Sequence, residues 1–201
     1  MPHFQDEQRL SPRTLLLFGV PIFVISVALS VFVHQYAHAV VGRLACEAQS
    51  LSPRNVLNLQ QNRFGCPTGV LAGPVATFAL AVISFALFMR SPRNLFFASM
   101  AFINASARIP DAVSAFFSLL VHQKPQAGID ESALVDLLRY QDPTIATVIL
   151  CFSLLTVICL TLIVVHDTHI IPRKWIVAPV LFAGMLLVQN AVWGILPTLA
   201  Q

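Results

Sequence analysis

Charged residues are scarce in this chain. Only 10% of its 201 residues are Asp, Glu, Lys or Arg, whereas soluble globular proteins contain about 25%. So little charge cannot cover the surface of a water-soluble domain of this size, which excludes an ordinary cytosolic domain. The 57% hydrophobic content excludes a disordered chain. The net charge of +3 is too small and too scattered to form a nucleic-acid-binding face, so no nucleic-acid partner is expected.

Cysteine motifs and a signal peptide are also missing. No Cys-x-x-Cys pair occurs, which excludes a zinc knuckle or a thioredoxin-like motif. Cys46 and Cys66 stand at the ends of one polar segment and could approach each other, whereas Cys151 and Cys159 are predicted to pack inside an apolar segment. No small-residue cleavage pattern follows a short apolar run near the start of the chain, so the first segment does not read as a cleaved signal peptide.

Long apolar runs are what the sequence has in abundance. About 20 mostly apolar residues are needed to cross a bilayer as a helix, and continuous runs of that length favour helices over barrel strands. We therefore predict an all-α integral membrane protein with about five transmembrane helices. The five runs are Leu15–Val33, continuing as helix beyond His34, then Val70–Met89, Leu95–Leu120, Ile145–Val165 and Trp175–Leu196.

The runs and the polar segments between them predict the organisation of the chain. Residues 1–13 form an N-terminal segment, and residues 14–120 form a three-helix core that contains a polar loop at 46–68. Residues 121–143 are predicted to form an amphipathic connector in the membrane interface, and 144–201 the last two spans. Basic residues are nearly balanced between the two sides of this topology, so the orientation stays open.

Two histidines lie at the end of the first apolar run. His34 and His38 are four residues apart, so a helix places both imidazoles on one face, one turn apart. This spacing allows both rings to bind one zinc ion. Polar residues at membrane depth are costly and commonly functional, which favours a metal site over two separate hydrogen-bonded histidines.

A third ligand is expected from the third apolar run. Asn104, Arg108 and Asp111 share one helix face there. If the first and third spans are parallel, His34 and Asp111 lie roughly 28 and 24 Å from the same membrane side, at 1.5 Å per residue. Asp111 is therefore the predicted ligand, and an ion pair with Arg108 is the alternative. Pro110 is expected to kink or open the helix beside it.

Three blocks of the sequence together resemble the site-2 protease family of intramembrane zinc metalloproteases. His34-Gln35-Tyr36-Ala37-His38 resembles the HExxH motif, and residues 69–76, with Ala72-Gly73-Pro74, resemble the family's Ala-Gly-Pro segment. Asn104 through Pro110-Asp111 resembles the block that supplies the third zinc ligand. Thr77 and Ala112 depart from the family, which often has Asn and Gly there. The similarity covers residues 14–120 and leaves the last two spans outside.

The resemblance implies cleavage of transmembrane substrate proteins within the bilayer of a prokaryotic cell membrane. Zn²⁺ would be held by His34, His38 and Asp111. Gly73 and Pro74 would provide an irregular edge for the substrate, with Arg108 nearby, and Asn104 would hydrogen-bond the substrate backbone or the oxyanion. The active site of this family commonly opens toward the cytosol.

The second position of the motif departs from the family in its chemistry. Glutamate there takes a proton from zinc-bound water, whereas Gln35 cannot ionise and cannot act as the base. We therefore expect an inactive protein that still binds zinc. The retained ligand pattern favours an engineered substitution; a natural pseudoprotease that binds membrane helices without cutting is the alternative. A haem-binding membrane protein, pairing His34 or His38 with His122, His166 or His169, is a third reading.

Overall fold

Every regular element in the described part of the chain is a helix. The computed structural model describes residues 11–46, 67–121, 143–168 and 174–199. The prediction of an all-α chain is confirmed for these ranges. The predicted loop 46–68 and connector 121–143 lie almost entirely outside them. The helices are α1 (Pro12–Thr14), the π-helix η2 (Leu15–Gly19), α2 (Val20–Cys46), α4 (Pro67–Arg90), α5 (Leu95–Ser106), α6 (Ile109–Leu120), α8 (Pro143–Asp167) and α9 (Lys174–Leu199).

Within the residues that the structure describes, three helical stretches are long and apolar enough to cross a membrane. They are Leu17–Leu44, Leu71–Arg90 and Trp175–Val192, with 28, 20 and 18 residues. They correspond to the first, second and fifth predicted spans. The fourth prediction falls on α8, whose apolar stretch Cys151–Asp167 is shorter within the part described. Helices of this length and hydropathy are compatible with a membrane protein.

The third predicted span, Leu95–Leu120, is interrupted, which confirms the expectation that Pro110 kinks or opens the helix beside it. It consists of α5 and α6, separated by a turn at Ala107 and Arg108. Pro110 explains the break, because its ring would clash with the carbonyl of Ser106, four residues earlier, where α5 ends. The apolar run predicted the location of the segment, and the proline broke the helix within it.

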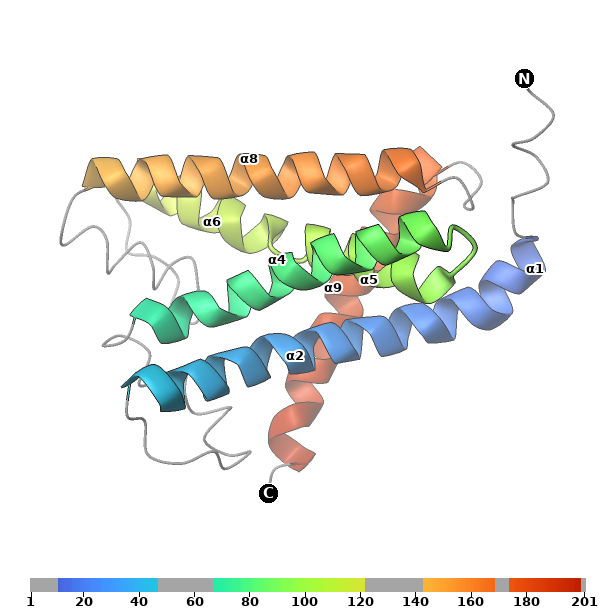
Figure 1. Ribbon diagram of the computed structural model, residues 1–201, viewed down its shortest axis with the longest axis horizontal. Helices are drawn as coiled ribbons and strands as arrows, with labels where there is room; N and C mark the ends of the chain where they lie inside the picture. Colours follow the sequence, from blue (N-terminus) through green and yellow to red (C-terminus); the bar gives the residue numbers. More distant parts are fainter. Residues whose placement is uncertain (1–10, 47–66, 122–142, 169–173, 200–201) are drawn as a thin grey trace.

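The helices form a bundle around α5 (Figure 1). α2 and α4 lie side by side and run in opposite directions, and α5 packs against both. α8 covers α5 and α6, while α9 crosses behind α2 at a steep angle. α2 and α5 both begin at the same end of the bundle, as expected for parallel first and third spans. This arrangement brings the end of α5 beside the middle of α2 and α4.

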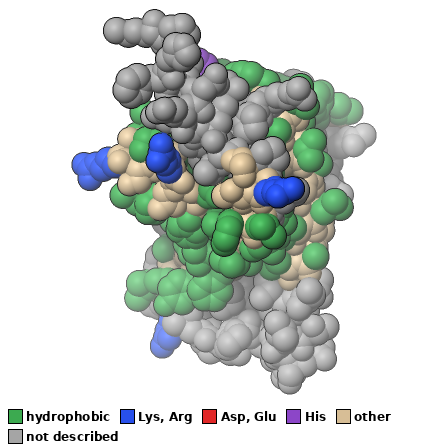
Figure 2. Space-filling model, turned by 90° about the vertical axis from the view of Figure 1, so that its right-hand side faces the viewer, with side chains coloured by type: hydrophobic (Ala, Val, Ile, Leu, Met, Phe, Trp, Pro, Cys, Tyr) green, Lys and Arg blue, Asp and Glu red, His purple; other side chains and the backbone are tan. Residues whose placement is uncertain are grey.

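The main core joins all the long helices, and apolar side chains also cover the outside. Phe23, Phe102 and Met185 belong to one buried cluster to which α2, α4, α5, α8 and α9 contribute. On the outer surface, Phe152 and Leu187 are 72% and 73% exposed. Figure 2 shows hydrophobic side chains over much of the described part of one end of the bundle, with a few Lys and Arg side chains beside them. Such a surface fits a lipid environment, because apolar area is costly in water.

Cys151 and Cys159 belong to this outer surface. Both lie in the fourth predicted span as exposed free thiols on α8, so the prediction that they only pack is wrong with respect to the described part of the chain. An apolar run that spans a membrane has no polar face to mark its outer side, which is why the sequence pattern did not separate packed from outward-facing cysteines. Cys46 ends α2, and Cys66 lies outside the described residues.

Candidate functional site

The centre of the candidate site is the pair of imidazoles on α2. The Nε2 atoms of His34 and His38 are 3.1 Å apart, and the two rings meet edge to face with centroids 4.7 Å apart. His38 is buried and His34 is half-buried. Because Zn–N bonds are about 2.0–2.1 Å long, a separation of 3.1 Å corresponds to a ligand–metal–ligand angle of about 100°. The pair therefore has the spacing that a shared metal ion requires.

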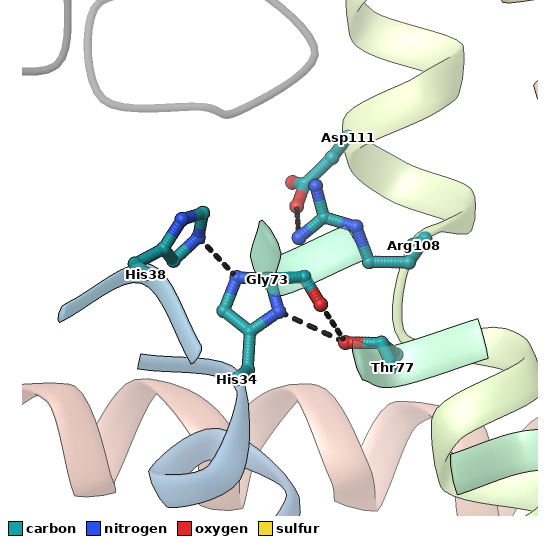
Figure 3. Close-up of polar contacts among 6 residues, drawn as sticks. All are labelled: His34, His38, Gly73, Thr77, Arg108 and Asp111. Carbon is teal, nitrogen blue, oxygen red and sulfur yellow. Dashed lines mark hydrogen bonds and ion pairs between the residues drawn. The ribbon is translucent and has the colours of Figure 1, made fainter. Parts of the chain in front are cut away.

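The two imidazole rings lie against a row of small residues on α4, which we call the stripe. Gly69, Gly73 and Thr77 are spaced four residues apart and so share one helix face. His38 Nδ1 lies 2.6 Å from the carbonyl oxygen of Gly69, and His34 Nδ1 lies 2.9 Å from the Thr77 hydroxyl. Because α2 and α4 are antiparallel, the later histidine contacts the earlier residue, Gly69, and the earlier histidine contacts the later residue, Thr77. Figure 3 shows His34 beside Thr77.

These contacts fix how the rings are protonated. A carbonyl can only accept, so the Gly69 contact places a proton on Nδ1 of His38. The Nε2 atom of a neutral His38 then carries a lone pair that faces the other ring. The 3.1 Å contact between the two Nε2 atoms is a hydrogen bond if His34 carries its hydrogen on Nε2; if both Nε2 atoms carry lone pairs, a cation has to lie between them. Oxygen acceptors on the outer ring nitrogen are the usual support of zinc-binding histidines.

Gly73 lies directly against both rings. A Cβ atom at this position would be 2.1 Å from His38 Nε2 and 2.7 Å from His34 Nε2. No side chain larger than hydrogen fits while the rings converge. Gly73 and Pro74 were expected to form an irregular edge for substrate, and this expectation is wrong in geometry, because α4 is helical from Pro67 to Arg90. Their predicted role in substrate binding stays a prediction.

Asp111 forms an ion pair with Arg108. The Nη1 to Oδ2 distance is 3.3 Å, and the Arg108 side chain is 8% exposed. Figure 3 shows both groups in the same region as the imidazoles, consistent with the expected depth of Asp111. Among the residues that the structure describes, no three His, Cys, Asp or Glu side chains form a metal-binding group. The alternative interpretation, an ion pair, is thus present, and the predicted role of Asp111 as a ligand stays a prediction.

Asn104 lies one helical turn before Arg108 and is buried. Its Nδ2 atom donates to the Ser30 hydroxyl at 2.9 Å and to the Met100 carbonyl at 2.8 Å. Its Oδ1 atom is buried and accepts no hydrogen bond from any described residue. The donor that an oxyanion would need is therefore committed to other partners. The unused capacity of Asn104 is that of an acceptor, suited to water or to an N–H group.

Gln35 is 7% exposed and follows the first histidine on α2. It directly follows His34, as the second residue of the HExxH motif does. The structure thus keeps Gln35 inside the bundle, at the beginning of the turn that separates the two imidazoles.

Two residues that contact the predicted site residues, Thr77 and Ser30, were not predicted from the sequence. Thr77 was noticed only as a departure from a family pattern, and Ser30 was not singled out. Ser30 is one helical turn before His34, and Thr77 one turn after Gly73. The i, i+4 spacing of polar residues on apolar helices is the signal that would have found both of them.

Comparisons with known proteins leave the family open. No protein-family model, curated protein or solved structure matches this chain. Over the described ranges, the fold and the site define a helical membrane-type bundle with an apolar outer surface and a pair of converging imidazoles inside it.

Proposed function

We propose that this protein is built as an intramembrane zinc metalloprotease of the site-2 type, made inactive by Gln35. The observation that carries the proposal is the convergence of the His34 and His38 Nε2 atoms at 3.1 Å, each ring having an oxygen partner on Nδ1. The outward apolar side chains support a multi-pass protein in a lipid bilayer. The substrate would be a transmembrane protein, reached through the bilayer.

The two imidazoles fit a zinc ion, and a third ligand would have to come from a side chain that rearranges. His34 and His38 would supply two nitrogens, and Asp111 would supply an oxygen on leaving or sharing its ion pair with Arg108. When bound, zinc supplies a Lewis acid and lowers the pKa of a coordinated water to about 7. Arg108 would keep the second carboxylate oxygen, which orients Asp111 without requiring the guanidinium to face the metal.

Gln35 decides what such a site can do. An amide can hold a water by hydrogen bonding, but it cannot take the proton from that water. The present chain would therefore bind a membrane helix and zinc without hydrolysis. A natural pseudoprotease is the second candidate function, and Gln35 is the residue that favours it.

Zinc content tests the proposal. We expect the purified protein to bind about one zinc ion, and His34→Ala and His38→Ala each to lose most of it, because one remaining imidazole cannot hold the metal with Asp111 alone. The measurement is metal analysis after equilibrium dialysis in detergent. His166→Ala is the matched control, since His166 is exposed at the end of α8.

The same experiment separates the alternatives. Wild-type protein without zinc would refute the proposal, and a Soret band in its place would support the haem reading. If both histidine variants keep wild-type zinc content, the metal is bound elsewhere and the site is misplaced.

Asp111→Ala tests the third ligand. We expect zinc to bind at least about 100-fold more weakly than in the wild type, because a direct ligand is lost whereas loss of a ligand's supporting partner alone costs about 10–100-fold; competition with a chromophoric chelator measures it. Arg108 loses its ion-pair partner in this variant, so thermal unfolding should be recorded alongside. Unchanged zinc affinity in a folded Asp111→Ala protein would show that another residue completes the site.

A further inference from the structure

We propose that Thr77 is a positioning residue, which sets the nitrogen of His34 that carries the proton and so directs the other nitrogen toward the metal. This inference rests on the proposed zinc site. Thr77 is 4% exposed and lies on the α4 face that meets α2. Its hydroxyl makes two contacts, one with His34 Nδ1 at 2.9 Å and one with the Gly73 carbonyl oxygen at 3.0 Å.

Counting protons determines the direction of both hydrogen bonds. The Gly73 carbonyl can only accept, so the single hydroxyl proton of Thr77 is donated there. The Thr77 oxygen then acts as an acceptor toward His34, and Nδ1 of His34 must be the donor. With neutral groups this is the one arrangement that makes both contacts hydrogen bonds, and the 3.1 Å contact between the two Nε2 atoms then has no hydrogen of its own and needs a cation. It leaves a lone pair on the His34 Nε2 atom, the atom that faces His38.

The tautomers of the two histidines are thus fixed by different kinds of group. The His38 ring is held by a backbone carbonyl, at Gly69, which no side-chain substitution removes. The Nδ1 atom of His34 contacts a side-chain hydroxyl, that of Thr77, which a substitution does remove. Without that hydroxyl, both neutral tautomers of His34 become accessible, and the one with hydrogen on Nε2 presents a proton where the metal needs a lone pair. Thr77 is therefore the side chain through which the tautomer of this site can be changed.

Two substitutions of Thr77 separate the hydroxyl from the shape of the side chain. Thr77→Val keeps the branched shape and removes the acceptor, whereas Thr77→Ser keeps the acceptor. We expect zinc affinity, from chelator competition, to fall about 10–100-fold in Thr77→Val and to stay close to wild type in Thr77→Ser. Thr161→Val is the matched control, because Thr161 on α8 also donates to a carbonyl four residues earlier, Val157, at 2.8 Å.

A spectroscopic measurement reads the tautomer directly. In zinc-free protein labelled with ¹⁵N-histidine, we expect the wild type and Thr77→Ser to show His34 protonated at Nδ1, and Thr77→Val to show a mixture. Equal zinc affinity in Thr77→Val and wild type, or an unchanged tautomer, would overturn the inference while the zinc site stands. If the wild type binds no zinc, the proposed function fails, and the spectra still decide the role of Thr77.

Discussion

Replacing Gln35 with glutamate is expected to make this protein a chelator-sensitive protease. The variant gains a carboxylate that can accept a proton from a water at the metal, and such general-base help contributes about 10²–10⁴-fold to a rate. Gln35 is 7% exposed, so the new carboxylate lies inside the bundle, where it needs a nearby cation to remain charged. A zinc ion between the flanking histidines would provide that cation.

The measurement is cleavage of single-span substrate proteins in liposomes, with and without chelator. Two variants serve as controls. Gln189→Glu makes the same chemical change on α9, outside the His34–His38 segment, and should cleave nothing. The double variant Gln35→Glu/His38→Ala should lose the activity that glutamate restores. Zinc binding without cleavage in Gln35→Glu, across a broad substrate set, would favour the binding-only pseudoprotease.

The sequence predicted the long helices well, because an apolar run of about 20 residues is too long for a strand or a loop. The runs at 70–89 and 175–196 lie within α4 and α9, and the run at 145–165 lies within α8. The break in the third run was harder to locate. Pro110 signalled a kink, but a complete turn at Ala107 and Arg108 depends on how α5 packs against its neighbours. These contacts between helices produce no periodic pattern of polar and apolar residues in a segment that is apolar throughout.

Only those contacts of the site that join residues close in the sequence were predictable. The four-residue spacing placed His34 and His38 on one face, and the three-residue spacing placed Arg108 within reach of Asp111. The partners of the rings come from another helix, and the register between α2 and α4 decides them. Thr77 and Gly69 meet the histidines because the helices are antiparallel and closely packed at Gly73. No pattern in either segment alone contains that register.

Gly73→Ala is expected to abolish zinc binding while the protein still folds. The added methyl group would lie 2.1 Å from His38 Nε2 and 2.6 Å from His34 Cε1. These atoms are the ends of two side chains, so the rings can rotate away at an overpacking cost of about 1–3 kcal/mol. Rotation separates the two Nε2 atoms, and the geometry for a shared metal is lost.

Zinc content and thermal unfolding measured on the same sample distinguish this effect from misfolding. Gly184→Ala on α9 is the matched control, because a Cβ there has no heavy atom within 4 Å. It should keep its zinc, and alanine stabilises a helix over glycine by about 1 kcal/mol. A Gly73→Ala protein with wild-type zinc affinity would mean that the rings bind metal in another orientation, away from α4. Loss of zinc in Gly73→Ala alone ties metal binding to the close approach of α4 and α2.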